Sequence, residues 1–210
     1  MARPPNADAT ATKQRILDCA LSMFSEGGES VSIRKVAKGS GVTLATVHHY
    51  FGSKADLWDA CVGSMYDELD ALQAELLGLF PRLAMSSRRE ALRTVVVTTF
   101  RFARAHQPAM RMMLRAVVES GQVPDDRRER VQKPFLERAS ELLSVPFGRP
   151  PESLRLPLQS AVFLIARYAI SSDAELEMLA GEVDPLANVE AHLVEVATAI
   201  LSLPNQEPSA

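Results

Sequence analysis

The sequence has no uninterrupted apolar stretch of about 18 residues, the length that a membrane-spanning helix needs. Its first residues, M-A-R-P-P-N-A-D-A-T, include no apolar segment of the kind found in secretory signals. Only two cysteines occur, Cys19 and Cys61, and both fall in helical patterns rather than at metal-ligand spacing. We therefore expect a cytoplasmic protein with reduced thiols and no membrane partner.

Motifs that carry catalysis or hold cofactors are also missing. The chain contains no G-x-S-x-G, Walker or dinucleotide-binding motif, and Ser53-Lys54 lies at a helix start rather than in a nucleophile pair. Its four histidines (48, 49, 106 and 192) have no cysteine or carboxylate at ligand spacing around them. The sequence thus predicts no enzyme, no metal site and no cofactor.

No strand pattern, repeat or low-complexity block is present, whereas apolar residues recur at helical spacing along most of the chain. An all-α fold is predicted. The first helix is expected to begin near Thr10 or Thr12, and another to begin after Ser53. Further helices are expected over 88–105, 108–120, 125–143, 154–170 and 186–201, with 154–170 apolar nearly all round and therefore buried on several sides.

Acidic residues are absent from Val31 to Ala55, a stretch that carries four basic residues: Arg34, Lys35, Lys38 and Lys54. The whole chain has a net charge of −3, so this local excess of positive charge is not a general property of the chain. A basic surface of this kind suits the phosphates of a nucleic acid. Charge alone leaves open a solvated helix face that binds nothing.

Residues 32–51 have the pattern of two short helices joined by a tight turn. Ser32 and Thr43 are good N-caps, and Gly39-Ser40-Gly41 between them is a helix stop. The small Ala37, Gly41 four residues later and the valines around them suit two helices that pack at a steep angle. This pattern predicts a helix-turn-helix, whose second helix enters the major groove of DNA.

Three segments resemble the DNA-binding domain of TetR-type transcriptional regulators: I-L-D-C-A-L-S-M-F-S-E-G-G (16–28), the helix-turn-helix at 32–51, and S-K-A-D-L (53–57). The resemblance implies that Arg34 reaches a base and that Thr46 and Lys54 contact phosphates. At His48-His49 the chain departs from the family, which usually has two tyrosines there. The expected DNA-binding residues are Arg34, Lys35, Thr43, Leu44, Ala45, Thr46, His48, His49 and Lys54.

The same resemblance implies a homodimer on a palindromic operator in double-stranded DNA, with the two copies joined through helices 154–170 and 186–201. It also implies a larger C-terminal helical domain that binds a small effector. We therefore expect a disordered arm at 1–9, a three-helix DNA-binding domain at 10–60, a ligand-binding and dimerisation domain at 61–203 and a flexible tail at 204–210.

An apolar ligand cavity could form between the C-terminal helices, since methionine suits pockets that fit ligands loosely. Methionine and phenylalanine at helical spacing are also ordinary core residues. Arg167 would need a partner or a ligand if it were buried on an apolar helix. The candidate lining residues are Phe100, His106, Met110, Met113, Phe135, Phe163, Arg167 and Tyr168.

The predicted function is therefore a DNA-binding regulator, most simply a repressor that a small apolar effector releases from its operator. The alternative is a helical ligand-binding or adaptor dimer that no longer recognises a DNA sequence. The acid-free basic stretch around the second helix argues against that alternative.

Overall fold

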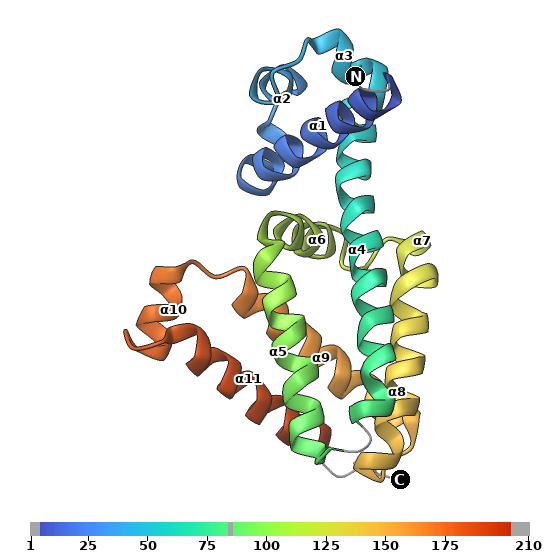
Figure 1. Cartoon of the computed structure of the whole chain (residues 1–210), viewed down its shortest axis with the longest axis vertical. Helices are drawn as coiled ribbons and strands as arrows, with labels where there is room; N and C mark the ends of the chain where they lie inside the picture. Colours follow the sequence, from blue (N-terminus) through green and yellow to red (C-terminus); the bar gives the residue numbers. More distant parts are fainter. Residues whose placement is uncertain (1–4, 84–85, 203–210) are drawn as a thin grey trace. The chain divides into compact units, whose positions relative to one another are not determined.

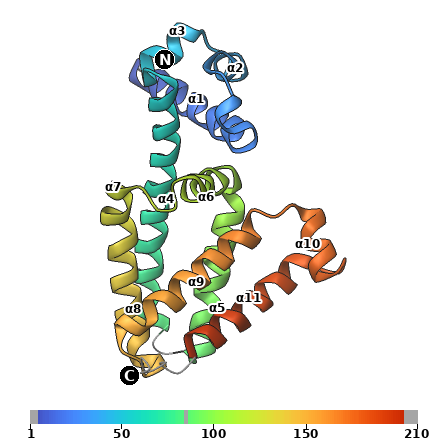
Figure 2. The same ribbon diagram turned by 180° about the vertical axis from the view of Figure 1, so that it is seen from behind.

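The computed structural model describes residues 5–83 and 86–202, and the regular elements in these two ranges are all helices (Figures 1 and 2). The prediction of an all-α fold is confirmed. The elements are α1 (Pro5–Gly27), η1 (Gly28–Ser30), α2 (Ile33–Gly39), α3 (Leu44–Phe51), α4 (Lys54–Leu83), α5 (Arg88–Ala105), α6 (Gln107–Ser120), α7 (Asp125–Arg127), η2 (Arg128–Gln132), α8 (Lys133–Phe147), α9 (Pro151–Ala169), α10 (Asp173–Ala180) and α11 (Pro185–Ser202).

Helix α1 begins at Pro5, whereas the sequence predicted a start near Thr10 or Thr12 after an arm at residues 1–9. Proline is well tolerated at the first position of a helix, where its missing N–H costs no hydrogen bond. Asp8 lies in the first turn, where the helix dipole favours an acid. Residues 1–4 and the expected tail at 204–210 lie outside the described residues.

The chain divides into two compact units, and the division differs from the expected one. The first unit holds the described residues up to Leu69 together with Pro108–Val123, and the second holds Asp70–Gln107 and the described residues from Pro124 onward. Helix α4 is continuous over 30 residues and contributes to both units. Periodicity could not reveal a boundary inside one unbroken helix.

Within the first unit, α1, α2 and α3 surround a small apolar core (Figure 1). Ile16 and Phe24 of α1 and Val47 of α3 are completely buried. The ring of Phe24 lies 5.2 Å from that of Trp58 on α4. The start of α4 therefore packs against the helix that supports the helix-turn-helix.

Helix α6 also belongs to the first unit, although it lies far along the chain. The guanidinium group of Arg115 on α6 lies directly against Gly28 at the end of α1, where a side chain would clash with it. Gly28 has φ +52°, a conformation that glycine adopts without strain. The glycine therefore serves both the turn and the approach of α6.

In the second unit, α5, α9 and α11 pack on one another and α8 packs on α9. Completely or almost completely buried side chains, among them Phe100, Leu154 and Leu193, form its core. The connection between α8 and α9 is shorter than the predicted helix ranges 125–143 and 154–170 imply, because α8 continues to Phe147 and α9 begins at Pro151. Helix α10 was not predicted.

The composition of α9 suggested that the helix is buried on several sides, but only one of its faces is buried. Leu156 and Phe163 are 80% and 41% exposed, while Leu154, Leu158 and Ile165 are buried. Apolar composition predicted burial correctly for one face of the helix. The other face exposes large apolar side chains, which commonly marks an interaction surface.

The two cysteines differ in reactivity. Burial raises the pKa of Cys61 to about 12, with Asp18 adding a smaller effect, whereas Cys19 is half-buried and its pKa is raised by burial alone. Because the thiolate is the reactive form, iodoacetamide at pH 8 should label Cys19 in the folded protein much faster than Cys61. Peptide mass spectrometry before and after unfolding measures both rates. Equal labelling in the folded protein would contradict the packing described here.

Among the described residues, no helix is both long and apolar enough to cross a membrane.

Candidate DNA interface

Helix α2 begins and ends where the sequence predicted. The hydroxyl oxygen of Ser32 accepts a hydrogen bond from the backbone N–H of Lys35 (3.3 Å), as an N-cap does. After the helix, Gly41 has φ +68°, and Val42 N–H donates to the Ala37 carbonyl (3.0 Å). This left-handed turn fixes the direction in which the chain enters α3.

The role expected for Gly41 in close packing is wrong. A side chain there would meet nothing within 4 Å, so glycine serves only the backbone conformation at this position. Close packing instead involves Gly39, where a Cβ atom would lie 2.8 Å from the sulfur of Cys19 and against Met23 on α1. Arg15 of α1 secures the turn by donating from Nε to the Ser40 carbonyl (3.0 Å).

Helix α3 is amphipathic. Thr43 caps it, since its hydroxyl oxygen accepts from the Thr46 N–H (3.1 Å). Val47 is completely buried, and the exposed stripe at spacing i, i+3 and i+4 consists of Ala45, His48 and His49. A small residue followed by two hydrogen-bonding rings is a surface that can approach base edges closely.

The turn after α3 is held by a ring of local hydrogen bonds. Gly52 has φ +77°; its N–H donates to the His48 carbonyl (2.9 Å), and its own carbonyl accepts from Nδ1 of His48 (2.6 Å). The Asp56 carboxylate accepts from the hydroxyl (2.6 Å) and the N–H (2.8 Å) of Ser53, and these bonds lower its pKa. Lys54 thus starts α4 from a defined position.

The structure brings the predicted DNA-binding residues together in one part of the first unit. Arg34, Lys35 and Thr43 are exposed together with the α3 stripe, whereas Leu44, Thr46 and Lys54 are half-buried. This arrangement combines a short exposed helix with basic side chains on its neighbour and no acid between Val31 and Ala55. Such a surface can insert one helix into a major groove while lysine and arginine contact the phosphates.

The family model for "Bacterial regulatory proteins, tetR family" matches residues 16–61, which span the helices just described. The chain therefore carries a DNA-binding segment of the TetR type at these residues.

Curated members of the TetR family resemble the chain over different lengths. The transcriptional regulator AcrR of Shigella flexneri is 35% identical over 100 residues, 47% of this chain and 46% of AcrR. The regulator SrpR of Pseudomonas putida is 26% identical over 166 residues, 78% of this chain and 75% of SrpR. The chain thus spans about half the length of the first of these relatives and three quarters of the second.

The TetR-family fold extends beyond the matched segment. A TetR-like regulator from Rhodococcus sp. RHA1 superposes with a TM-score of 0.61 over 91% of this chain and 96% of the other, at 19% identity. At this identity the likeness concerns the fold alone.

The predicted ligand-binding residues are divided between the two units. Met110 and Met113 belong to the first unit, and the other six to the second. Phe163 is 41% exposed on α9. Arg167 is exposed rather than buried: it donates to Glu175 (2.7 Å), which lowers the pKa of that carboxyl group, and to Ser171 (2.6 Å). Its charge is therefore satisfied on the surface.

Two of the other candidates, His106 and Tyr168, make local contacts. His106 donates from Nδ1 to the Phe102 carbonyl (2.8 Å) and lies against the Phe102 ring. Tyr168 makes an edge contact with His192, at 5.8 Å between ring centres. Phe135 is half-buried.

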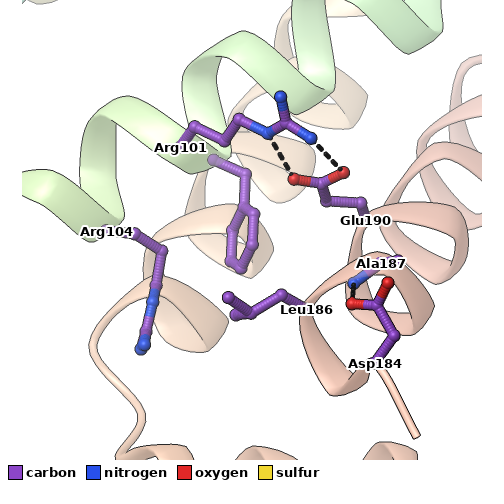
Figure 3. Close-up of a pocket in the computed structure, with 7 residues that line it drawn as sticks. Arg101, Arg104, Asp184, Leu186, Ala187 and Glu190 are labelled. Carbon is purple, nitrogen blue, oxygen red and sulfur yellow. Dashed lines mark hydrogen bonds and ion pairs between the residues drawn. The ribbon is translucent and has the colours of Figure 1, made fainter.

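A pocket of about 350 Å³ lies between α5 and α11 (Figure 3). Of the predicted residues it includes only Phe100. Its lining residues are Phe100, Arg101, Arg104, Asp184, Leu186, Ala187 and Glu190, so it carries more charge than the apolar cavity expected from the sequence.

An ion pair crosses this pocket. Arg101 donates from Nε (2.6 Å) and Nη2 (3.0 Å) to the carboxylate of Glu190, and the two bonds are drawn in Figure 3. The Glu190 side chain is only 8% exposed, whereas that of Arg101 is 70% exposed. The sequence held one signal for this buried carboxylate: Glu190 directly follows Val189 and lies three residues before Leu193, both of which are buried on the inward face of α11.

Proposed function

We propose that this chain is a sequence-specific DNA-binding regulator that binds a palindromic operator as a homodimer and acts as a repressor. The observation that carries the proposal is the capped helix α3, whose exposed stripe of Ala45, His48 and His49 is flanked by basic residues. The family supports transcriptional regulation in general. We infer repression, rather than activation, because repressors are typical of that family.

Selection from a pool of random duplex DNA, followed by sequencing, tests this proposal. We expect enrichment of a palindrome whose half-sites lie about one helical turn apart, because each copy presents one α3 to a major groove. Raising the salt from 50 to 200 mM should weaken binding steeply, because lysine and arginine displace counterions from phosphates. If no sequence were enriched at low salt, the adaptor alternative would replace this proposal.

Helices α9 and α11 are the proposed dimer contact. They pack on each other, and α9 exposes Leu156 and Phe163 seven residues apart, on one face of the helix. The outer side of α11 carries the small exposed residues Ala191 and Ala199, which allow a second helix to approach closely. Together these features suit a bundle of four helices from two copies.

Phe163→Glu should therefore convert the dimer to a monomer, since it places a charge where an apolar contact is proposed. Sedimentation velocity over a range of protein concentrations measures the change, and circular dichroism checks that the helices are retained. Val145→Glu is the matched control, because Val145 is 88% exposed on α8, outside the proposed contact. A Phe163→Glu protein that stayed dimeric would contradict this assignment of the interface.

We further propose that a small molecule bound in the second unit regulates DNA binding. Helix α4 offers a physical connection, because its 30 residues begin at Lys54 beside the DNA-binding surface and continue into the second unit. An effector needs to favour the form that does not bind DNA by only a few kcal/mol to release the operator. Operator binding measured against a panel of small molecules tests this part of the proposal, and an operator affinity that no compound changed would count against it.

A further inference from the structure

We propose that His48 is a specificity-determining residue that accepts a hydrogen bond from the exocyclic amino group of a cytosine or an adenine in the operator. The proposal rests on the DNA binding argued above and adds the chemical group that one side chain recognises. It follows from the hydrogen bond that one ring nitrogen of His48, Nδ1, already makes with the turn after α3.

The Gly52 carbonyl determines which ring nitrogen of His48 carries the proton. It lies 2.6 Å from Nδ1 of His48, and a carbonyl oxygen can only accept a hydrogen bond. Nδ1 must therefore carry hydrogen. In a neutral imidazole the other nitrogen, Nε2, then has a lone pair and no hydrogen, so it can only accept.

Hydrogen bonds to the backbone of Gly52 favour this tautomer of His48. The Gly52 N–H donates back to the His48 carbonyl (2.9 Å), so the same glycine residue binds both the main chain and the side chain of His48. Gly52 in turn has φ +77° and precedes the Ser53–Asp56 capping bonds. The other neutral tautomer, with hydrogen on Nε2, would place the lone pair of Nδ1 against the Gly52 carbonyl oxygen.

An acceptor at Nε2 excludes the contact most often made to DNA. Phosphate oxygens are acceptors, so neutral His48 cannot donate to a phosphate from Nε2. The hydrogen-bond donors in the major groove are N4 of cytosine and N6 of adenine. His48 is exposed on the same stripe as Ala45, whose small side chain lets the helix approach the base edges.

The experiment repeats the random-duplex selection at pH 8, where an ordinary histidine is neutral, with the full-length wild type and three variants. His48→Asn retains a donor near the position of Nδ1 and removes Nε2. His48→Lys supplies a donor that suits phosphate. Lys133→Gln is the control, because Lys133 lies on α8 in the second unit and pairs with Glu129 (2.7 Å), outside the DNA-binding surface.

The expected result is a preference for cytosine or adenine at one position of each half-site, reduced about tenfold in His48→Asn and retained in Lys133→Gln. His48→Lys should lose this preference as well. If either His48 variant lost affinity equally for all sequences, or if His48→Lys retained the wild-type site, His48 would be a phosphate contact and the proposal would be overturned.

Imidazole ¹⁵N–¹H correlation spectra of the protein without DNA supply an independent measurement. We expect the Nδ1–H tautomer for the ring whose signals disappear in His48→Asn, and an Nε2–H tautomer would overturn the proposal without touching DNA binding. If the wild type enriched no site at all, the proposed function and this inference would fall together. An enriched site that His48 does not influence would leave the function intact and refute this inference alone.

Discussion

Arg34→Glu should lower the affinity for the selected operator by about 100-fold or more. Arg34 is exposed on α2, inside the stretch that contains no acid, and it is the basic residue that the resemblance to the family assigns to a base. Losing a base contact costs about 1–3 kcal/mol, and the new carboxylate adds repulsion from nearby phosphates. Fluorescence anisotropy with labelled duplex at fixed salt measures the change.

Lys133→Glu is the control for Arg34→Glu, because it alters the net charge of the chain by the same amount. Lys133 lies on α8 in the second unit and pairs with Glu129 (2.7 Å). It should leave operator affinity within about threefold of the wild type, since exposed ion pairs contribute little. Equal losses in the two variants would mean that bulk charge, and not the α2–α3 surface, governs binding.

Phe24→Ala should destabilise the DNA-binding helices by about 3–5 kcal/mol, the usual cost of removing a fully buried phenylalanine. Phe24 is completely buried and its ring contacts that of Trp58. Trp58 is the only tryptophan in the chain, so its fluorescence during urea unfolding reports on this region. The midpoint of that transition should fall clearly, and operator binding at 37 °C should fall with it.

Phe24→Leu serves as the matched variant because it retains most of the apolar volume. We expect it to cost under about 1.5 kcal/mol and to keep operator binding. A Phe24→Ala protein with the wild-type Trp58 transition would show that this ring does not hold α1 against α4.

The helix-turn-helix could be predicted from the sequence because local chemistry determines it. Ser32 and Thr43 cap their helices through their own side chains, and Gly41 adopts the left-handed turn that its neighbours cannot adopt easily. These interactions span three or four residues, so spacing alone reveals them. The exposed stripe on α3 follows from the same spacing.

The second unit was harder to predict, because its features depend on contacts between distant residues. Arg101 and Glu190 are 89 positions apart, and nothing local to either one indicates the other. Arg167 was expected to need a partner if buried, yet it lies at the surface beside Glu175 on α10, a helix that was not predicted. The partner of Arg167 could therefore not be predicted from the sequence.

The central claim is that this chain recognises a DNA sequence as a pair of copies. The most direct test compares its affinity for the selected palindrome with that for a shuffled duplex of equal composition, while sedimentation measures the mass of each complex. The account predicts two chains per palindrome and at least about 1000-fold tighter binding to it than to the shuffled duplex. Equal affinity for the two duplexes, with the same dependence on salt, would contradict it and leave only a basic surface that binds any DNA.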